Sequence, residues 1–149
     1  MSENFEDTDF DPTSNGLFNF NPNSDDFEWQ RSSLSANGNG NGSALFNNYE
    51  GVNSNNPFGT FDALITPIYN FSEVSDAKLT FDLAYARYAD GNQFFNDSLI
   101  VLVSTDCGTN YNQQIFLDGG ATLETGTASN QPFLPSNICL LYTSPSPRD

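Results

Sequence analysis

Hydrophobic and polar residues alternate along several short stretches of this chain, and two neighbouring stretches show it most clearly. In residues 78–87 every second side chain is apolar, so a strand there would have one apolar and one polar face. The run at residues 98–104 is apolar on both faces, which is typical of a central strand covered on both sides. Residues 89–93 between them are rich in turn formers. The pattern therefore predicts two strong strands joined by a polar loop.

Further apolar stretches are short, and Asn, Gly and Pro, which favour turns, separate them. Trp29 lies in one of these stretches and is the expected large anchor of a core. No long window has a helical periodicity. Many short strands at roughly even spacing predict an all-β fold, an antiparallel β-sandwich or jelly roll. The other predicted strands are residues 17–20, 27–32, 43–49, 62–69, 115–117 and 121–123.

The charge of the chain limits its partners. Its 149 residues leave room for one domain and include 4 Lys and Arg against 19 Asp and Glu, a net charge of −15. A phosphate backbone would be repelled, so nucleic acid is not an expected partner. An acidic, Asn-rich surface suits calcium or neutral sugars, although a plain secreted surface has the same composition.

The sequence lacks residues that several kinds of catalysis and metal binding require. The chain contains no His, which excludes imidazole acid–base catalysis, His-containing triads and the usual zinc sites. No apolar run is long enough to span a bilayer, and the polar, acidic start is not a signal peptide. Because the rest of the chain has an extracellular character, we expect that Met1 is an internal or artificial start of a longer protein.

The last residues require a separate interpretation. Residues 139–149 can be back-translated into DNA that resembles the transposase end and adapter used to prepare sequencing libraries. We therefore expect one truncated module at residues 1–138, and an artefact rather than a domain at residues 139–149. Cys139 would then belong to the artefact, so no disulfide between it and Cys107 is expected.

Six short signatures follow one another along the chain. They are Phe5-Glu6, residues 21–29 ending in Glu28-Trp29, and residues 42–45, 63–67, 79–81 and 99–104. In that order they resemble the MAM-like jelly rolls of secreted Bacteroidota proteins, whose relatives include cleaved-adhesin and choice-of-anchor J modules. The resemblance implies a two-sheet jelly roll, here incomplete at its C-terminus, which would expose an apolar face and unpaired edges.

The resemblance also implies a role. Such modules are non-catalytic accessory parts of larger secreted or cell-surface proteins, and they serve adhesion or the targeting of substrates and glycans. The expected partners are therefore protein or carbohydrate at the cell surface and other domains of a parent chain. A purely structural spacer that binds nothing is an alternative.

An oxygen-rich loop before Trp29 is the candidate calcium site. Calcium prefers six to eight oxygen ligands, and this loop places oxygen-bearing side chains at alternate positions. Related adhesin modules resemble it with an Asp-rich loop before the Trp, and they bind calcium. An Asx-rich turn and a solvated acid are the alternative. The candidate ligands are Asn21, Asn23, Asp25 and Asp26, with Glu6 as a second, structural site.

Two further sets of residues are candidates for binding or catalysis. Tyr85, Tyr88, Phe94 and Phe95 could form an exposed platform for a sugar or a protein, or could pack in the core or in loops. Glycosidases use paired carboxylates, and the chain has acids beside its predicted strands but no recognisable catalytic motif. The leading prediction is therefore not an enzyme, with a glycoside hydrolase or peptidase-associated enzyme fragment as the alternative. The acids considered are Asp62, Asp82 and Asp97.

Overall fold

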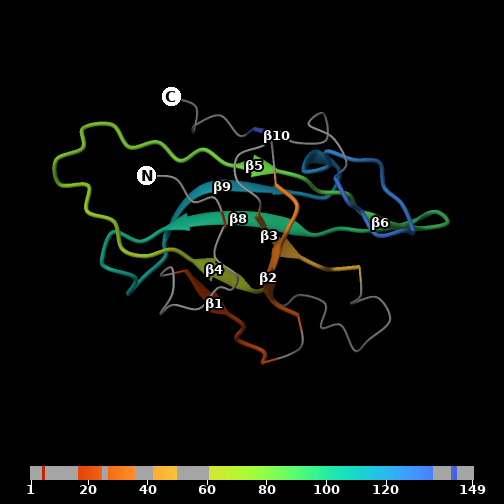
Figure 1. Ribbon diagram of the computed structural model, residues 1–149, viewed down its shortest axis with the longest axis horizontal. Helices are drawn as coiled ribbons and strands as arrows, with labels where there is room; N and C mark the ends of the chain where they lie inside the picture. Colours follow the sequence, from red (N-terminus) through yellow and green to blue (C-terminus); the bar gives the residue numbers. More distant parts are fainter. Residues whose placement is uncertain are drawn as a thin grey trace. The chain divides into compact units, whose positions relative to one another are not determined.

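The computed structural model describes residues 5, 17–24, 27–35, 42–49, 61–135 and 142–143 (Figure 1). These residues form short antiparallel strands that pair two by two, and a 3-10 helix of three residues. The described part is thus all-β, as the sequence predicted, and is consistent with a β-sandwich. It contains no helix that is long and apolar enough to cross a membrane. The chain divides into two compact units, Met1–Pro67 and Ile68–Asp149.

The first unit contains two strand pairs. β1 (Phe18–Phe20) pairs with β4 (Ala63–Ile65), and β2 (Trp29–Ser32) pairs with β3 (Ser43–Phe46), both antiparallel. All four lie within stretches that the sequence predicted as strands, and each strand is shorter than the predicted stretch. The ends of the predicted stretches carry Asn, Pro and polar residues, which do not continue the ladders.

Trp29 joins the two strand pairs of the first unit. Its ring packs edge-on against that of Phe46, its cross-strand partner, with the centroids 5.5 Å apart. Its indole N–H donates a hydrogen bond to the backbone oxygen of Asp62 at 3.1 Å, just before β4. Trp29 is partly buried, and these two contacts make it a link between the two strand pairs.

The second unit contains three strand pairs. β8 and β9 form the longest ribbon, with a bulge between Val101 and Leu102. The pairs are β5 (Asp82–Leu83) with β10 (Tyr142–Thr143), β6 (Tyr88–Asp90) with β7 (Gln93–Phe95) and β8 (Ser98–Val103) with β9 (Gln113–Gly119), followed by the 3-10 helix η2 (Gly120–Thr122).

The prediction that residues 98–104 are covered on both faces is wrong. On one face of the ribbon, Phe116 packs edge-on against Phe81 at 5.3 Å between centroids. On the other face Ile100 lies opposite Leu117, and these side chains are 51% and 54% exposed. The sequence alone could not show this, because an apolar strand looks the same whether or not a second layer covers it.

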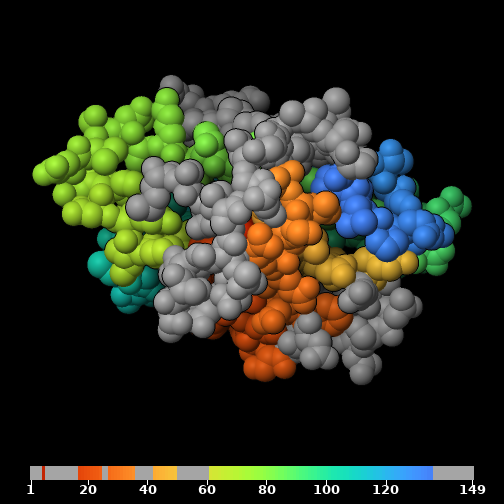
Figure 2. Space-filling model, in the orientation of Figure 1, coloured from red at the N-terminus to blue at the C-terminus, as the bar shows by residue number. Residues whose placement is uncertain are grey.

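The predicted strand at residues 78–87 is also largely wrong, because only Asp82–Leu83 is a strand. Residues 85–89 pair instead with the segment at residues 125–129. The N–H of Thr125 donates to the oxygen of Tyr85 at 2.8 Å, and the N–H of Ala89 donates to the oxygen of Ser129 at 3.0 Å. Figure 2 shows this C-terminal segment in blue against the green hairpin tip. Its lack of alternation explains why the pairing was not predicted.

At two glycine-containing turns the structure differs from the prediction made from the sequence. Residues 89–93, which the sequence predicted as a polar loop, form the centre of the β6–β7 hairpin, where Gly91 has a φ of +59°. The predicted strand at residues 121–123 is instead part of η2 and the residue that follows it. Gly120 has a φ of +56°, which turns the chain away from an extended conformation at that point.

Candidate functional site

Tyr85 holds the connection between β7 and β8 in place. The N–H of Asp97 donates to the Tyr85 hydroxyl at 3.0 Å, and this hydroxyl donates to Asp97 Oδ2 at 3.3 Å. The N–H of Gly120 donates to the backbone oxygen of Asp97 at 2.9 Å. Burial raises the pKa of Tyr85 to about 12, so the phenol keeps its proton at neutral pH. These bonds fix the neighbouring residues Asn96 and Ser98.

Arg87 and Glu124 form a largely buried ion pair. Arg87 Nη2 donates to Glu124 Oε2 at 3.0 Å, and Nε lies 3.0 Å from Oε1. The hydrogen bond between the side chains lowers the pKa of Glu124 and raises the pKa of Arg87. The guanidinium carbon also lies 4.4 Å from the ring centroid of Phe94, a cation–π contact. The guanidinium is therefore held in one position, and its charge is offset.

An open groove of about 700 Å³ lies between these segments of the second unit. The groove is shallow and open to solvent, so a ligand in it would keep part of its surface exposed. Most of the residues that line the groove are polar or are glycines, and two are apolar. The lining residues are Arg87, Asn96, Ser98, Leu117, Asp118, Gly119, Gly120 and Ala121.

Several polar atoms of the groove have hydrogen-bonding capacity that no other described residue uses. The amide of Asn96 and the hydroxyl of Ser98 make no hydrogen bond within the described part of the chain. Asp118 Oδ1 accepts from the N–H of Gly119 at 2.8 Å and from the hydroxyl of Thr122. Asp118 Oδ2 accepts no hydrogen bond from the same described residues. The groove thus presents an amide, a hydroxyl and a carboxylate oxygen.

Gly119 and Gly120 keep the groove open. A Cβ atom on Gly119 would collide with Ser98 Oγ and would lie 3.0 Å from the backbone oxygen of Asp97. A Cβ atom on Gly120 would lie 3.2 Å from Asn96 Oδ1. Side chains at these two positions would therefore fill the space in front of the two polar groups that are free to bind.

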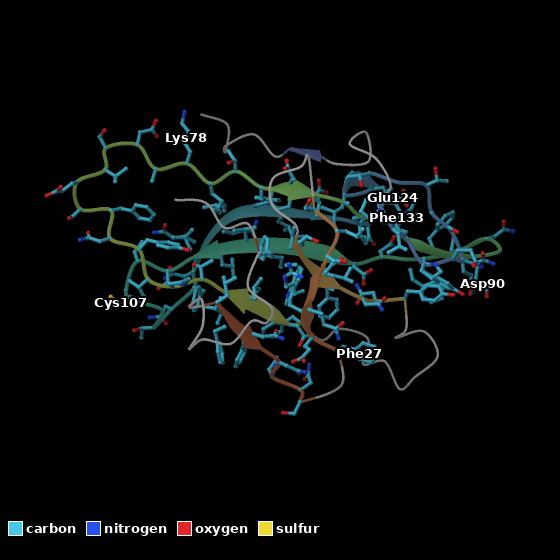
Figure 3. All side chains as sticks on the ribbon, viewed as in Figure 1. Phe27, Lys78, Asp90, Cys107, Glu124 and Phe133 are labelled. Atoms are coloured by element: carbon cyan, nitrogen blue, oxygen red, sulfur yellow. The ribbon has the colours of Figure 1, made fainter. Side chains whose placement is uncertain are left out.

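The turn after β8 (residues 104–110, here the Asp106 turn) is built differently. Ser104 Oγ donates to Asp106 Oδ1 at 2.7 Å, and the side-chain amide of Asn110 donates to Oδ2 at 2.7 Å. These bonds, above all the one from Asn110, lower the pKa of Asp106 to about 2. Cys107 is exposed at this turn with a φ of +59°. Figure 3 shows it at the end of the unit opposite Asp90 and Glu124.

The four aromatic residues predicted to bind a ligand do not form one platform. Tyr88 and Phe95 are partners across the β6–β7 hairpin, with their ring centroids 5.5 Å apart. Phe94 lies on the opposite face of the hairpin, because neighbouring residues of a strand point to opposite faces, and is 49% exposed. The hydroxyl of Tyr85 is bonded to Asp97. Phe94 lies beside Arg87, a residue of the groove lining.

The predicted calcium loop lies in the first unit, and the structure describes part of it. The side-chain amide of Asn21 donates to the backbone oxygen of Phe27 at 3.1 Å, and Asn23 is exposed in a turn. The joint role of Asn21 and Asn23 as calcium ligands stays a prediction. Three of the predicted ligands lie outside the described residues: Glu6, Asp25 and Asp26.

Two further oxygen-bearing side chains lie close to this loop. Asn19 donates through its amide to the backbone oxygen of Trp29 at 2.9 Å and to Glu28 Oε2 at 3.1 Å. Its own Oδ1 is buried and accepts no hydrogen bond from the described residues. The β1–β4 register, extended by one residue, places Asn21 opposite Asp62. Among the described residues no three Asp, Glu, His or Cys form a metal-binding group, so amide oxygens would be required.

The acids considered for catalysis have different surroundings. Asp97 accepts a hydrogen bond from Tyr85, and Asp82 is exposed on β5. The groove itself is lined by one carboxylate, that of Asp118, whereas glycosidases place two on either side of the scissile bond.

The sequence-based reasoning did not identify the groove. In the sequence, Asp118-Gly119-Gly120 only separates the predicted strands at residues 115–117 and 121–123, and no motif marks Asn96 or Ser98 as a binding residue. One signal was present, because Arg87 is one of only 4 basic residues in a strongly acidic chain. Its partner, Glu124, is 37 positions away in the sequence, so the pattern around Arg87 does not reveal it.

No protein-family model matches this chain, and no curated protein or solved structure shows significant similarity to it. The resemblance to MAM-like modules therefore stays a prediction from the six signatures. The function has to be argued from the groove and from the oxygen-rich loop.

Proposed function

We propose that this chain is a non-catalytic binding module of a secreted or cell-surface protein, and that its groove holds the ligand. The module would serve adhesion or the targeting of substrates and glycans for a larger parent chain. The observation that carries the proposal is the set of polar atoms that stay unused around an open groove. Asn96 and Ser98 are exposed, so their polar atoms are hydrated in the free protein, and a ligand with matching hydrogen-bonding groups can replace that water.

Calcium is proposed as a structural ion of the first unit. The buried Oδ1 of Asn19 and the neighbouring side chains of Asn21 and Asp62 offer the hard oxygen donors that calcium prefers. An ion at this place would tie the end of the β1–β4 ladder to the loop before Trp29. Calcium should then raise the melting temperature of the chain, and magnesium, which requires a tighter octahedral site, should raise it less.

The binding proposal is tested with the full chain on an array of glycans and extracellular-matrix proteins, in calcium and in chelator. We expect a specific signal that Asn96→Ala weakens about tenfold, because the amide supplies a hydrogen bond to the ligand. The control is Asn92→Ala, which changes an exposed amide in the hairpin turn and should bind as the wild type does. A folded chain that binds nothing on the array would contradict the proposal and favour a structural spacer.

A further inference from the structure

The charges around the groove disfavour an anionic ligand. Arg87 is its cation, and Glu124 already offsets this charge through two contacts at 3.0 Å. Asp118 adds an uncompensated carboxylate to the lining. The chain as a whole has a net charge of −15, which repels further negative charge. A phosphate, sulfate or uronate group would therefore enter an unfavourable potential.

The unused polar atoms suit a ligand that carries hydroxyl groups. Asn96 can donate and accept through its amide, Ser98 can do both through its hydroxyl, and Asp118 Oδ2 can only accept. A hydroxyl group donates one hydrogen bond and accepts others, so it can pair with any one of these three side chains. A peptide strand would instead require backbone partners in a row, and the groove offers side chains of three different kinds.

The apolar part of the lining suits the carbon-bound hydrogen atoms of a sugar ring. Leu117 is 54% exposed and lines the groove together with Ala121. Carbohydrates present polar edges and less polar faces, so a site for them combines a few placed polar groups with an apolar surface. Phe94, whose ring contacts Arg87, extends the apolar surface beside the groove.

From these observations we infer that the groove binds an uncharged carbohydrate, with Asn96, Ser98 and Asp118 as its hydrogen-bonding residues. This inference rests on the proposed function and names the ligand class of the same site. Gly119 and Gly120 allow the ring to approach the backbone, because a side chain at either position would occupy that space.

The test is isothermal titration calorimetry of the full chain with soluble probes of matched size. The neutral probes are oligosaccharides of glucan, mannan and xylan, and the acidic probes are oligogalacturonate and oligoalginate. We expect binding of at least one neutral probe and none of the acidic ones. Asp118→Asn turns an accepting oxygen into a donor and should weaken the neutral probe about tenfold or more. The control, Asp90→Asn, removes an equal charge at the exposed hairpin turn and should bind normally.

The outcomes separate this inference from the proposed function. Binding of an acidic probe alone, or of a matrix protein alone, would overturn the inference and leave a binding module. Binding of a neutral probe that Asp118→Asn and Asn96→Ala both leave unchanged would place the ligand elsewhere and overturn the groove as its site. A folded chain that binds none of the probes and no matrix protein would overturn both. Circular dichroism of each variant shows that a loss of binding is not a loss of folding.

Discussion

The two ends of β8 show opposite uses of polar side chains. At the end near Val103, both carboxylate oxygens of Asp106 accept hydrogen bonds from Ser104 and Asn110, within seven residues of chain. At the end near Ser98, the groove leaves an amide, a hydroxyl and a carboxylate oxygen unused by the described residues. A turn that satisfies its own polar groups stabilises the fold, whereas a groove that does not can bind a ligand.

The two ends of β8 also differ in how far apart in the sequence their hydrogen-bonding partners lie. The Asp106 turn is local, since its bonds join residues two to four positions apart. The groove is assembled from β9, η2 and the connection after β7, which bonds from Tyr85 and Gly120 hold together over distances of 12 residues or more. Non-local positioning of exposed polar groups is what a binding site requires, because their geometry has to be fixed before the ligand arrives.

The largest effect is expected from filling the groove. In Gly119→Ala the new Cβ would meet Ser98 Oγ, so ligand binding should be lost and the free energy of unfolding should fall by about 1–3 kcal/mol. Calorimetry with the neutral probe and chemical denaturation measure the two quantities.

Gly91→Ala separates the loss of ligand binding from the loss of stability, which Gly119→Ala combines. No atom lies within 4 Å of a Cβ at Gly91, but its φ of +59° should make the alanine cost about 1–2 kcal/mol. This variant should therefore lose stability and keep full binding. If both glycine variants bound the ligand normally, the groove could not be the site.

A smaller and selective effect is expected from Glu124→Gln. The substitution removes the negative charge that offsets the guanidinium of Arg87, so the electrostatic potential of the groove becomes less unfavourable to anions. Binding of oligogalacturonate relative to a neutral probe should increase, while the neutral probe loses little affinity. The hydrogen bond from Arg87 lowers the pKa of Glu124, so this pair should also contribute stability that is lost as the pH falls below about 4.5. Unchanged selectivity would show that Arg87 does not set the charge of the groove.

The smallest effect on binding is expected at the other end of β8. The carboxylate of Asp106 has a pKa of about 2 in the folded chain against an ordinary value of 3.8. Its contribution to stability is therefore complete above about pH 4 and is lost as the pH falls from about 4 to about 2. Asp106→Asn should flatten this part of the stability profile and leave binding unchanged, as thermal unfolding between pH 2 and 7 and calorimetry at pH 7 can show.

Asp90→Asn is the control for the acid profile, since it changes an exposed charge at the end of β6. It should keep the decline between pH 4 and pH 2. A loss of ligand binding in Asp106→Asn would contradict the contrast between the two ends of β8.

Much of the fold could be predicted from local patterns. Short apolar runs such as the one at residues 98–104 and turn residues such as Gly91 and Asn92 carry their own signal, and the all-β class follows from them. The pairing of residues 85–89 with residues 125–129 could not be predicted, because it depends on backbone groups that every residue has. Whether Ile100 would be covered could not be predicted either, because that depends on a second layer.

The candidate site was harder to predict from the sequence than the fold was. The residues that line the groove are common types in common turns, and only their arrangement gives them a joint role. Asn96 and Asp118 are 22 positions apart and line the same groove because Ser98 pairs with Gly119 at the ends of β8 and β9. The calcium loop, by contrast, has a local pattern, and its prediction depended on that pattern alone.

The most direct measurement is an NMR titration of the isotopically labelled full chain with the neutral oligosaccharide that binds best. The contrast between the two ends of β8 predicts that amide shifts change at residues 96–98 and 117–121, and that residues 104–110 stay unchanged. Changes centred on residues 104–110, or changes in the first unit without any at residues 96–98, would contradict the assignment of the groove as the binding site.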